Sequence, residues 1–230
     1  MTFARCVWMG AIIALWLLTG TAQGVERSSR IGALSEETML STPDPNRNRL
    51  VWWMPQEYWE AVLSEESTPA SEKAASLQPI RPYIILGVAD GAIGAYGGIS
   101  YRSKAEIERD VSVKDAQAKL VRPYPEDQVN ADAKSLLAIM KPILENTIGE
   151  MGKNMHFFFF PVQDEKGQPI VDAKKEGVFV VMVGQEEFRW RLPLGALLPP
   201  KACPQCGEVL SGAYQFCPWD GTRLKEGGGT

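Results

Sequence analysis

The chain has 230 residues, of which 45% are hydrophobic and 23% are charged, and its formal net charge is −4. This length accommodates one ordinary domain with small additions, and the composition is that of a globular protein, which excludes global disorder. The acidic balance argues against a nucleic acid as the main partner, because nucleic-acid-binding domains usually carry a basic surface.

Residues 1–24 have the layout of a secretory signal peptide. Arg5 precedes an apolar run from Val7 to Leu18, and small and polar residues follow as far as Gly24. This pattern predicts cleavage near Gly24, since the apolar run is shorter than the roughly 20 residues of a membrane span. We therefore expect an extracytoplasmic protein, periplasmic or secreted, with no membrane span after cleavage. The alternative is a protein anchored in the membrane by an uncleaved N-terminal helix.

Residues 25–63 predict a loosely ordered leader followed by a short aromatic helix. Pro55 fits the first turn of that helix, where its missing N–H is no loss. The large aromatic side chains on either side of it are Trp52, Trp53, Tyr58 and Trp59. We interpret them as anchors on the main domain, because aromatic side chains dominate core burial. A platform that binds a sugar or a peptide is the functional alternative.

Residues 64–79 are rich in Ser, Glu, Ala and Pro, which predicts a linker or exposed loop. Residues 80–200 contain the main domain. A buried strand opens it, and the pair Asp90-Gly91 predicts a hairpin turn after this strand. A phosphate-binding glycine loop is the alternative, but neither G-x-x-x-x-G-K-[ST] nor G-x-G-x-x-G is present. The alternation around Val111 predicts a further strand pair.

A long helix is predicted after Asn130, whose side chain is suited to cap its N-terminus. Pro142 lies inside the helical pattern and predicts a kink or a break there. Gly149 and Gly152 are natural stops for the helix.

Two strong strand signals close the main domain. The sequence "HFFFF" predicts a buried strand, and "VFVVMVGQEEFRWRL" predicts a hairpin with Arg189 and Arg191 on its solvent face. With strands on both sides of one helical insertion, we predict an α+β fold with a mostly antiparallel sheet or a small sandwich. An immunoglobulin-like sandwich is one version of this fold, although the cysteine pair expected between its sheets is missing.

The C-terminal segment 201–225 carries a spaced set of metal-binding side chains: Cys203-x2-Cys206-x10-Cys217-x2-Asp220. A C-x-x-C step lets two thiolates converge on one ion, and two such turns build a tetrahedral Zn²⁺ site. The segment resembles the small zinc-ribbon modules, whose knuckles read CPxCG; here they read "CPQCG" and "CPWDG". The resemblance implies a structural zinc ion with the three cysteines as ligands, and Asp220 stands where the fourth cysteine would be.

Several alternatives for this site stay open. Asp220 can ligate zinc, or it can order its own turn while water or His156 fills the fourth position. A degenerate ribbon without metal, a disulfide, and a Cys203–Cys206 redox pair are further alternatives. Because signal cleavage leaves an odd number of cysteines, a metal site uses all three and a disulfide does not. We therefore favour zinc.

The nearby aromatic residues Tyr214, Phe216 and Trp219 are predicted to form the minimal core of the ribbon, with a contact surface as the alternative. The sequence contains no catalytic motif of the serine hydrolase, zincin or P-loop type. We therefore predict an exported, non-catalytic protein-interaction or structural protein that binds protein partners. The alternative is an extracytoplasmic hydrolase or thiol redox protein whose site lies unrecognised in the main domain.

Overall fold

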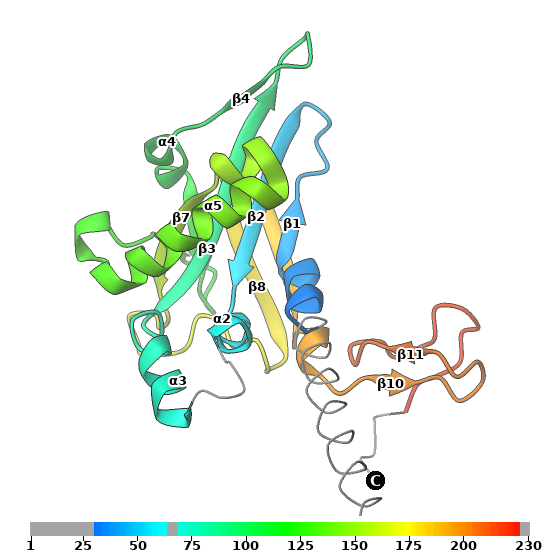
Figure 1. Cartoon of the computed structure of the whole chain (residues 1–230). Coiled ribbons are helices and arrows are strands. Elements are labelled where there is room, and N and C mark those ends of the chain that lie inside the picture. Colours follow the sequence, from blue (N-terminus) through cyan, green and yellow to red (C-terminus); the bar gives the residue numbers. More distant parts are fainter. Residues whose placement is uncertain (1–29, 64–68, 226–230) are drawn as a thin grey trace, which may run out of the picture.

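The computed structural model describes residues 30–63 and 69–225, which form two antiparallel sheets with flanking helices and a small C-terminal hairpin module (Figure 1). The predicted signal peptide at residues 1–24 lies outside the described residues. Among the residues that are described, no helix is both long enough and apolar enough to cross a membrane.

The first sheet is built around one long strand, β3 (Tyr83–Ile93). β2 (Arg47–Met54) pairs over its whole length with one edge of β3, and β1 (Met39–Ser41) continues the sheet beyond β2. β4 (Ile99–Tyr101) and β7 (His156–Pro161) share the other edge of β3. All four pairings are antiparallel, so this sheet is entirely antiparallel.

The second sheet has four strands in the order β6 (Leu120–Val121), β5 (Val111–Lys114), β8 (Gly177–Val183) and β9 (Glu186–Leu192). Its pairings are antiparallel too. The β8–β9 hairpin turns at Gly184, whose φ of 65° lies in the left-handed region that glycine adopts without strain. Both the predicted strand pair around Val111 and the predicted closing hairpin are confirmed.

Aromatic side chains pack the two sheets face to face. The ring of Trp53 on β2 lies 4.8 Å from that of Phe179 on β8 and 6.0 Å from that of Trp190 on β9. Trp52 on β2 contacts Tyr58 at a ring distance of 5.1 Å, and both side chains are buried. The prediction that these aromatic residues pack into the core is confirmed, although Trp52 and Trp53 belong to a strand.

Helix α5 (Ala131–Lys153) lies over the first sheet, in front of β3 and β7 in Figure 1. The Asn130 side chain caps it as predicted, accepting a hydrogen bond from Asp132 N at 2.7 Å. The kink lies at Ile148 and Gly149, where φ of Gly149 is 59°, and not at Pro142. Glycine adopts this backbone conformation without a Cβ penalty, which explains why the helix changes direction there.

Helix α2 (Gln56–Leu63) follows Pro55 as the sequence predicts. Two further helical stretches fall where the sequence predicts a leader or a linker: residues 30–38 and α3 (Ala70–Leu77). Leu34 and Thr38 of the first stretch are buried, with Ile31 packed against the core beside them, and Leu77 is the buried residue of α3. The remaining short helices are α4 (Lys104–Glu108), η1 (Glu126–Gln128) and η2 (Gly195–Leu197).

The predicted hairpin turn at Asp90-Gly91 is wrong. Strand β3 continues to Ile93, and the turn to β4 is closed by a hydrogen bond from Gly94 N to Gly98 O at 2.8 Å. The Asp90 carboxylate is fully buried and accepts from three arginine side chains: Arg49 at 2.9 Å, Arg102 at 3.0 Å and Arg47 at 3.4 Å. Because these cations neutralise it, the carboxylate lies in a strand interior, where the Asp-Gly turn signal does not apply.

The α+β class with antiparallel sheets is confirmed. Residues 104–153, between β4 and β7 in the chain, supply α4, α5 and also β5 and β6 of the second sheet.

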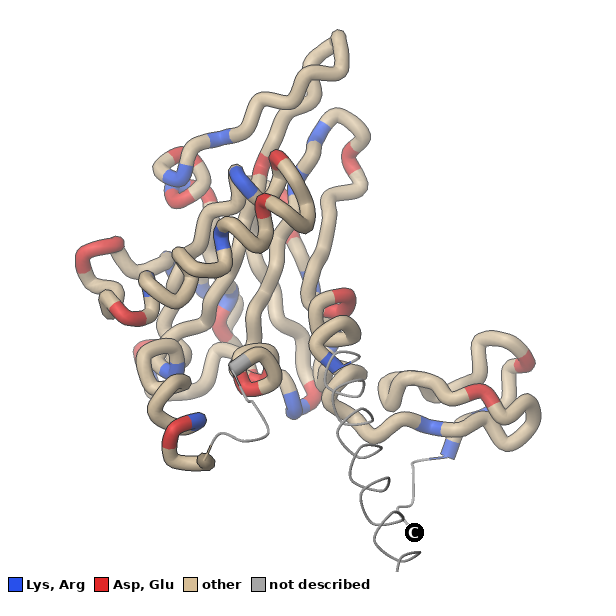
Figure 2. Tube along the Cα trace, in the orientation of Figure 1, with Lys and Arg blue, Asp and Glu red and all other residues tan. Residues whose placement is uncertain are grey.

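The charged residues of both signs are distributed over helices, loops and strands of the described chain (Figure 2).

Candidate metal centre

The cysteines lie in the C-terminal hairpin module, which begins with the strand pair β10 (Lys201–Ala202) and β11 (Val209–Leu210). We call residues 203–207 the first knuckle and residues 217–221 the second knuckle. The first knuckle connects β10 to β11, and the second lies inside an isolated bridge between Phe216 and Arg223. Each knuckle is therefore the turn of a short hairpin.

The two knuckles have the same backbone hydrogen bonds. Cys203 N donates to Glu208 O at 2.8 Å and Gly207 N donates to Cys203 O at 2.9 Å. In the second knuckle, Cys217 N donates to Thr222 O at 2.8 Å and Gly221 N donates to Cys217 O at 2.9 Å.

The knuckle glycines also match: φ is 77° at Gly207 and 73° at Gly221, a conformation that favours glycine. Asp220 therefore occupies the backbone position in the second knuckle that Cys206 occupies in the first.

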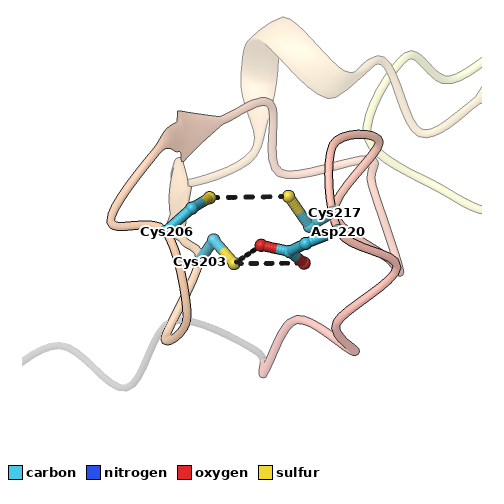
Figure 3. A group of neighbouring side chains, drawn as sticks. All are labelled: Cys203, Cys206, Cys217 and Asp220. Carbon is cyan, nitrogen blue, oxygen red and sulfur yellow. Dashed lines mark hydrogen bonds between the residues drawn. The ribbon is translucent and has the colours of Figure 1, made fainter.

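The four side chains converge from the two knuckles (Figure 3). Their candidate ligand atoms all lie within 4.8 Å of one another. Cys206 Sγ is 3.7 Å from Cys217 Sγ, and Cys203 Sγ is 3.3 Å and 3.7 Å from the two carboxylate oxygens of Asp220. The group is thus compact enough to hold a metal ion.

The separations in two of these ligand pairs can be compared with the edges of a tetrahedral site. Zn–S bonds of about 2.3 Å at tetrahedral angles place two sulfurs about 3.8 Å apart, and a Zn–O bond of about 2.1 Å places sulfur and oxygen about 3.6 Å apart. The 3.7 Å between the sulfurs of Cys206 and Cys217 is close to the first value. The two contacts between Cys203 and Asp220 lie on either side of the second. The residues therefore fit the ion.

The local hydrogen bonds favour charged ligands at two positions. The backbone N–H of Cys206 lowers the pKa of the Cys203 thiol, because it stabilises the thiolate. Hydrogen bonds from the side chain and backbone of Thr222 lower the pKa of Asp220 well below its usual range. Asp220 is therefore a carboxylate at neutral pH, which is the form that ligates a metal.

Cys206 differs from Cys203 in this respect. The N–H of Glu208 favours its thiolate, but desolvation and hydrogen bonds within the cluster outweigh this, and the pKa of Cys206 is raised to about 12. Crowding of three thiols and a carboxylate disfavours further negative charge. A divalent cation placed among them removes this penalty, since it stabilises every thiolate it contacts.

The three described cysteines are free. The separation of 3.7 Å between Cys206 Sγ and Cys217 Sγ is far longer than a disulfide bond of about 2.05 Å. His156 lies on β7 of the first sheet and does not belong to the cluster. Of the predicted candidates for the fourth position, Asp220 is the one that the fold brings to the sulfurs.

The aromatic residues of the module do not form its core, so that prediction is wrong. The module's buried side chains are Cys203, Cys217 and Leu224, with Leu210 packed against them. Four large side chains are instead exposed: Val209, Tyr214, Phe216 and Trp219, which is 75% exposed. We call these four residues the ribbon apolar face. The cluster of three cysteines and Asp220 lies where an aromatic core was predicted, and the aromatic side chains face solvent instead.

The module contacts the main domain through two glycines. A Cβ at Gly195 of η2 would lie 2.4 Å from Ser211 Oγ, and a Cβ at Gly212 would lie 2.4 Å from Leu198 Cβ. The Glu37 carboxylate also accepts hydrogen bonds from Gly195 N and from the backbone N–H that follows it. The module therefore packs closely against η2.

Three glutamates of the main domain that could serve as catalytic carboxylates form ion pairs instead. Glu57 pairs with Lys174 at 3.0 Å, and Glu186 pairs with the buried Arg49 at 2.6 Å. Glu187 pairs with Lys114 and Arg189. These glutamates are therefore tied into ion pairs.

Comparisons with protein-family models, with curated proteins and with solved structures found no match to this chain.

Proposed function

We propose that residues 201–225 form a structural zinc ribbon in which Cys203, Cys206, Cys217 and Asp220 hold one Zn²⁺ ion. The observation that carries this proposal is the agreement between the ligand separations and the edges of a zinc tetrahedron. Three sulfur ligands select a soft or borderline ion over magnesium or calcium, which prefer oxygen. The repeated knuckle backbone supports Asp220 as the fourth ligand.

The role of the ion is structural in this proposal. Four protein ligands complete a tetrahedron, whereas a catalytic zinc keeps a position open for water or substrate. The module buries few side chains besides its ligands, so metal binding supplies much of its folding free energy. When bound, zinc would cross-link the two knuckles, while the backbone turns of the chain position the ligands.

We further propose that the protein is exported and acts by contacting a protein partner through the ribbon apolar face. The exposure of Tyr214, Phe216 and Trp219 supports this, because aromatic side chains are enriched where proteins contact one another. The sequence layout of residues 1–24 supports export.

Metal analysis of the purified protein tests the zinc proposal. We expect about one zinc per chain, lost in Cys217→Ser and retained in Gln215→Ser, an exposed control in the same module. Zinc-free protein with a disulfide would contradict the proposal, and a disulfide between Cys203 and Cys206 would favour the redox alternative. The mass of protein recovered from the expressing cell tests export: we expect a chain that begins after Gly24, and an intact N-terminus would contradict cleavage.

A further inference from the structure

A cavity of about 300 Å³ lies in the main domain between α4, α5 and β7. Within the described chain β7 pairs only with β3, so no further strand fills the space beside its other edge. The segment before α5 closes one end, where Tyr124 N donates to Phe159 O at 2.7 Å. Helix α5 covers the rest, with Leu137 buried against the core. The cavity is therefore a consequence of the sheet topology.

The lining has an apolar wall and a cationic rim. Phenylalanines of β7, Met155 and Leu137 make up the apolar part. The charged part consists of Lys104, Lys134, Lys141, Glu108 and Glu126, which leaves a net charge of +1. Figure 2 shows the basic positions along α4 and α5. Such a combination of an apolar wall with a few convergent polar groups is typical of small-molecule sites.

The lysines of the rim differ in their partners. Lys104 pairs with Glu126 at 2.6 Å, and Lys134 Nζ donates to the backbone O of Glu126 at 3.1 Å. The side-chain ammonium group of Lys141, an exposed residue, has no hydrogen bond or ion pair with any residue that the structure describes. Its ammonium group is therefore available to an anion.

His156, half-buried on β7, also lines the cavity. Burial lowers its pKa, and the nearby ammonium groups of Lys141 and Lys104 lower it further, while a hydrogen bond to the backbone of Arg102 opposes them. The ring is therefore neutral at pH 7. The two lysines that act on it come from different helices, α5 and α4, and both line the cavity.

We propose that this cavity binds a small organic anion: a carboxylate or phosphate group joined to a compact apolar body. The acidic group lies at Lys141, beside His156, and the apolar body lies against the phenylalanines of β7. The volume equals that of about ten waters at ~30 Å³ each, which sets the size of the ligand near that of a single-ring aromatic acid.

The chain's single histidine makes the test direct, because His156 gives one ring signal in an NMR spectrum. We expect phenylacetate or phenyl phosphate to shift this signal saturably, and to raise the pKa of His156 because the anion offsets the field of Lys141. Comparison of these two probes identifies the preferred acidic group. Benzyl alcohol, which lacks the charge, and inorganic phosphate, which lacks the apolar body, are each expected to bind at least about tenfold more weakly.

Two variants localise the binding. Lys141→Gln is expected to weaken phenylacetate at least about tenfold, whereas Lys153→Gln on the same helix, outside the cavity, leaves it unchanged. Ala138→Phe fills the cavity without altering a charge and is expected to weaken binding as well. Absence of a saturable shift with both aromatic anions would overturn the proposal. The proposal would also be overturned if benzyl alcohol or inorganic phosphate bound as tightly as phenylacetate. The same holds if Lys141→Gln or Ala138→Phe bound phenylacetate as tightly as the wild type.

Discussion

The carboxylate of Asp220 lies 3.3 Å from the sulfur of Cys203, across the gap between two knuckles that share one backbone pattern. Asp220 holds the position of a knuckle cysteine, and Thr222 N also donates to its Oδ1 at 2.8 Å. The residue therefore has two candidate roles, metal ligand and turn stabiliser. Binding a metal requires the charged carboxylate, whereas stabilising the turn requires only a side-chain oxygen that accepts a hydrogen bond.

The first prediction separates these two roles. Asp220→Asn keeps an oxygen that can accept from Thr222 N but is a far weaker metal ligand, and Asp220→Cys restores the usual fourth ligand. We expect Asp220→Asn to lower zinc affinity by about 100-fold or more, since even residues behind the ligands contribute 10–100-fold. Asp220→Cys should bind at least as tightly as the wild type. Competition with a chromophoric chelator measures both, and wild-type affinity in Asp220→Asn would leave Asp220 with the turn role alone.

The second prediction concerns metal removal. The buried cluster of the module, with Cys203 and Cys217, is separate from the hydrophobic core of the main domain. A chelator should therefore unfold residues 203–222 and leave the two sheets folded. Hydrogen exchange measured by mass spectrometry checks this. We expect the N–H groups of Cys203 and Cys217 to lose protection while those of β2 and β3 keep it; loss of protection throughout would show that the module and main domain fold as one unit.

The third prediction concerns the buried ion pairs of Asp90. Burial alone would raise the pKa of Asp90, but hydrogen bonds from Arg49 and Arg102 outweigh it and lower the pKa below 3.8. Asp90→Asn removes the fully buried carboxylate charge that pairs with Arg49 and Arg102. Arg49 keeps Glu186 as a second close partner, and Arg102 keeps Asp110. The substitution should lower the free energy of unfolding by about 3 kcal/mol at pH 7. Urea denaturation measures the change.

The same pair gives a pH dependence. Because the pKa of Asp90 is depressed in the folded state, its contribution is present above the unfolded value near 3.9 and is lost as the pH falls through the folded value. The gap in stability between wild type and Asp90→Asn should narrow below about pH 4. Asp127→Asn, an exposed control on η1, should match the wild type at each pH. A gap that stays constant down to pH 2 would contradict this account of the carboxylate.

The fourth prediction concerns the ribbon apolar face. Phe216→Ala and Trp219→Ala remove side chains that are 54% and 75% exposed, so each should change the free energy of unfolding by less than about 0.5 kcal/mol. Both should retain zinc. Leu224→Ala, which truncates a buried side chain of the module, is the comparison and should loosen it. If Trp219→Ala unfolds the module, the aromatic residues belong to its core after all.

Sequence periodicity predicts the strands and the capped helix α5 because each of these elements has a continuous apolar pattern. The alternation of Phe188 and Trp190 with Arg189 and Arg191 corresponds directly to buried and exposed faces of β9. Helix α3 is not predictable in this way, since its one buried residue, Leu77, leaves no period to detect. In residues 30–38 only Ile31 and Leu34 are large apolar residues on the buried side, and the buried Thr38 adds nothing to an apolar pattern.

The turn predicted at Asp90-Gly91 fails because the arginines that neutralise Asp90 lie elsewhere in the chain, at positions 47, 49 and 102. A local Asp-Gly motif does not encode this tertiary effect. The interruption of α5 is different, because it lies at Gly149, which the sequence predicts as a stop for the helix. Only the choice between Gly149 and Pro142 as the site of the kink is not decided by the local pattern.

The candidate metal site is predictable from spacing alone, because its ligands come from two short turns within 18 residues of chain. The exposure of Tyr214 and Trp219 is not predictable from the sequence, since aromatic residues with this spacing could equally well form a core. The cavity beside β7 is also hidden from the sequence, as it arises from how α4 and α5 cross an open strand edge.

X-ray absorption at the zinc edge of the purified, metal-loaded protein tests the central claim most directly. We expect a first coordination shell of about three sulfurs at about 2.3 Å and one oxygen at 2.0–2.2 Å, with the oxygen replaced by a fourth sulfur in Asp220→Cys. A shell of nitrogen and oxygen only, or an unchanged shell in Asp220→Cys, would contradict a centre built from Cys203, Cys206, Cys217 and Asp220.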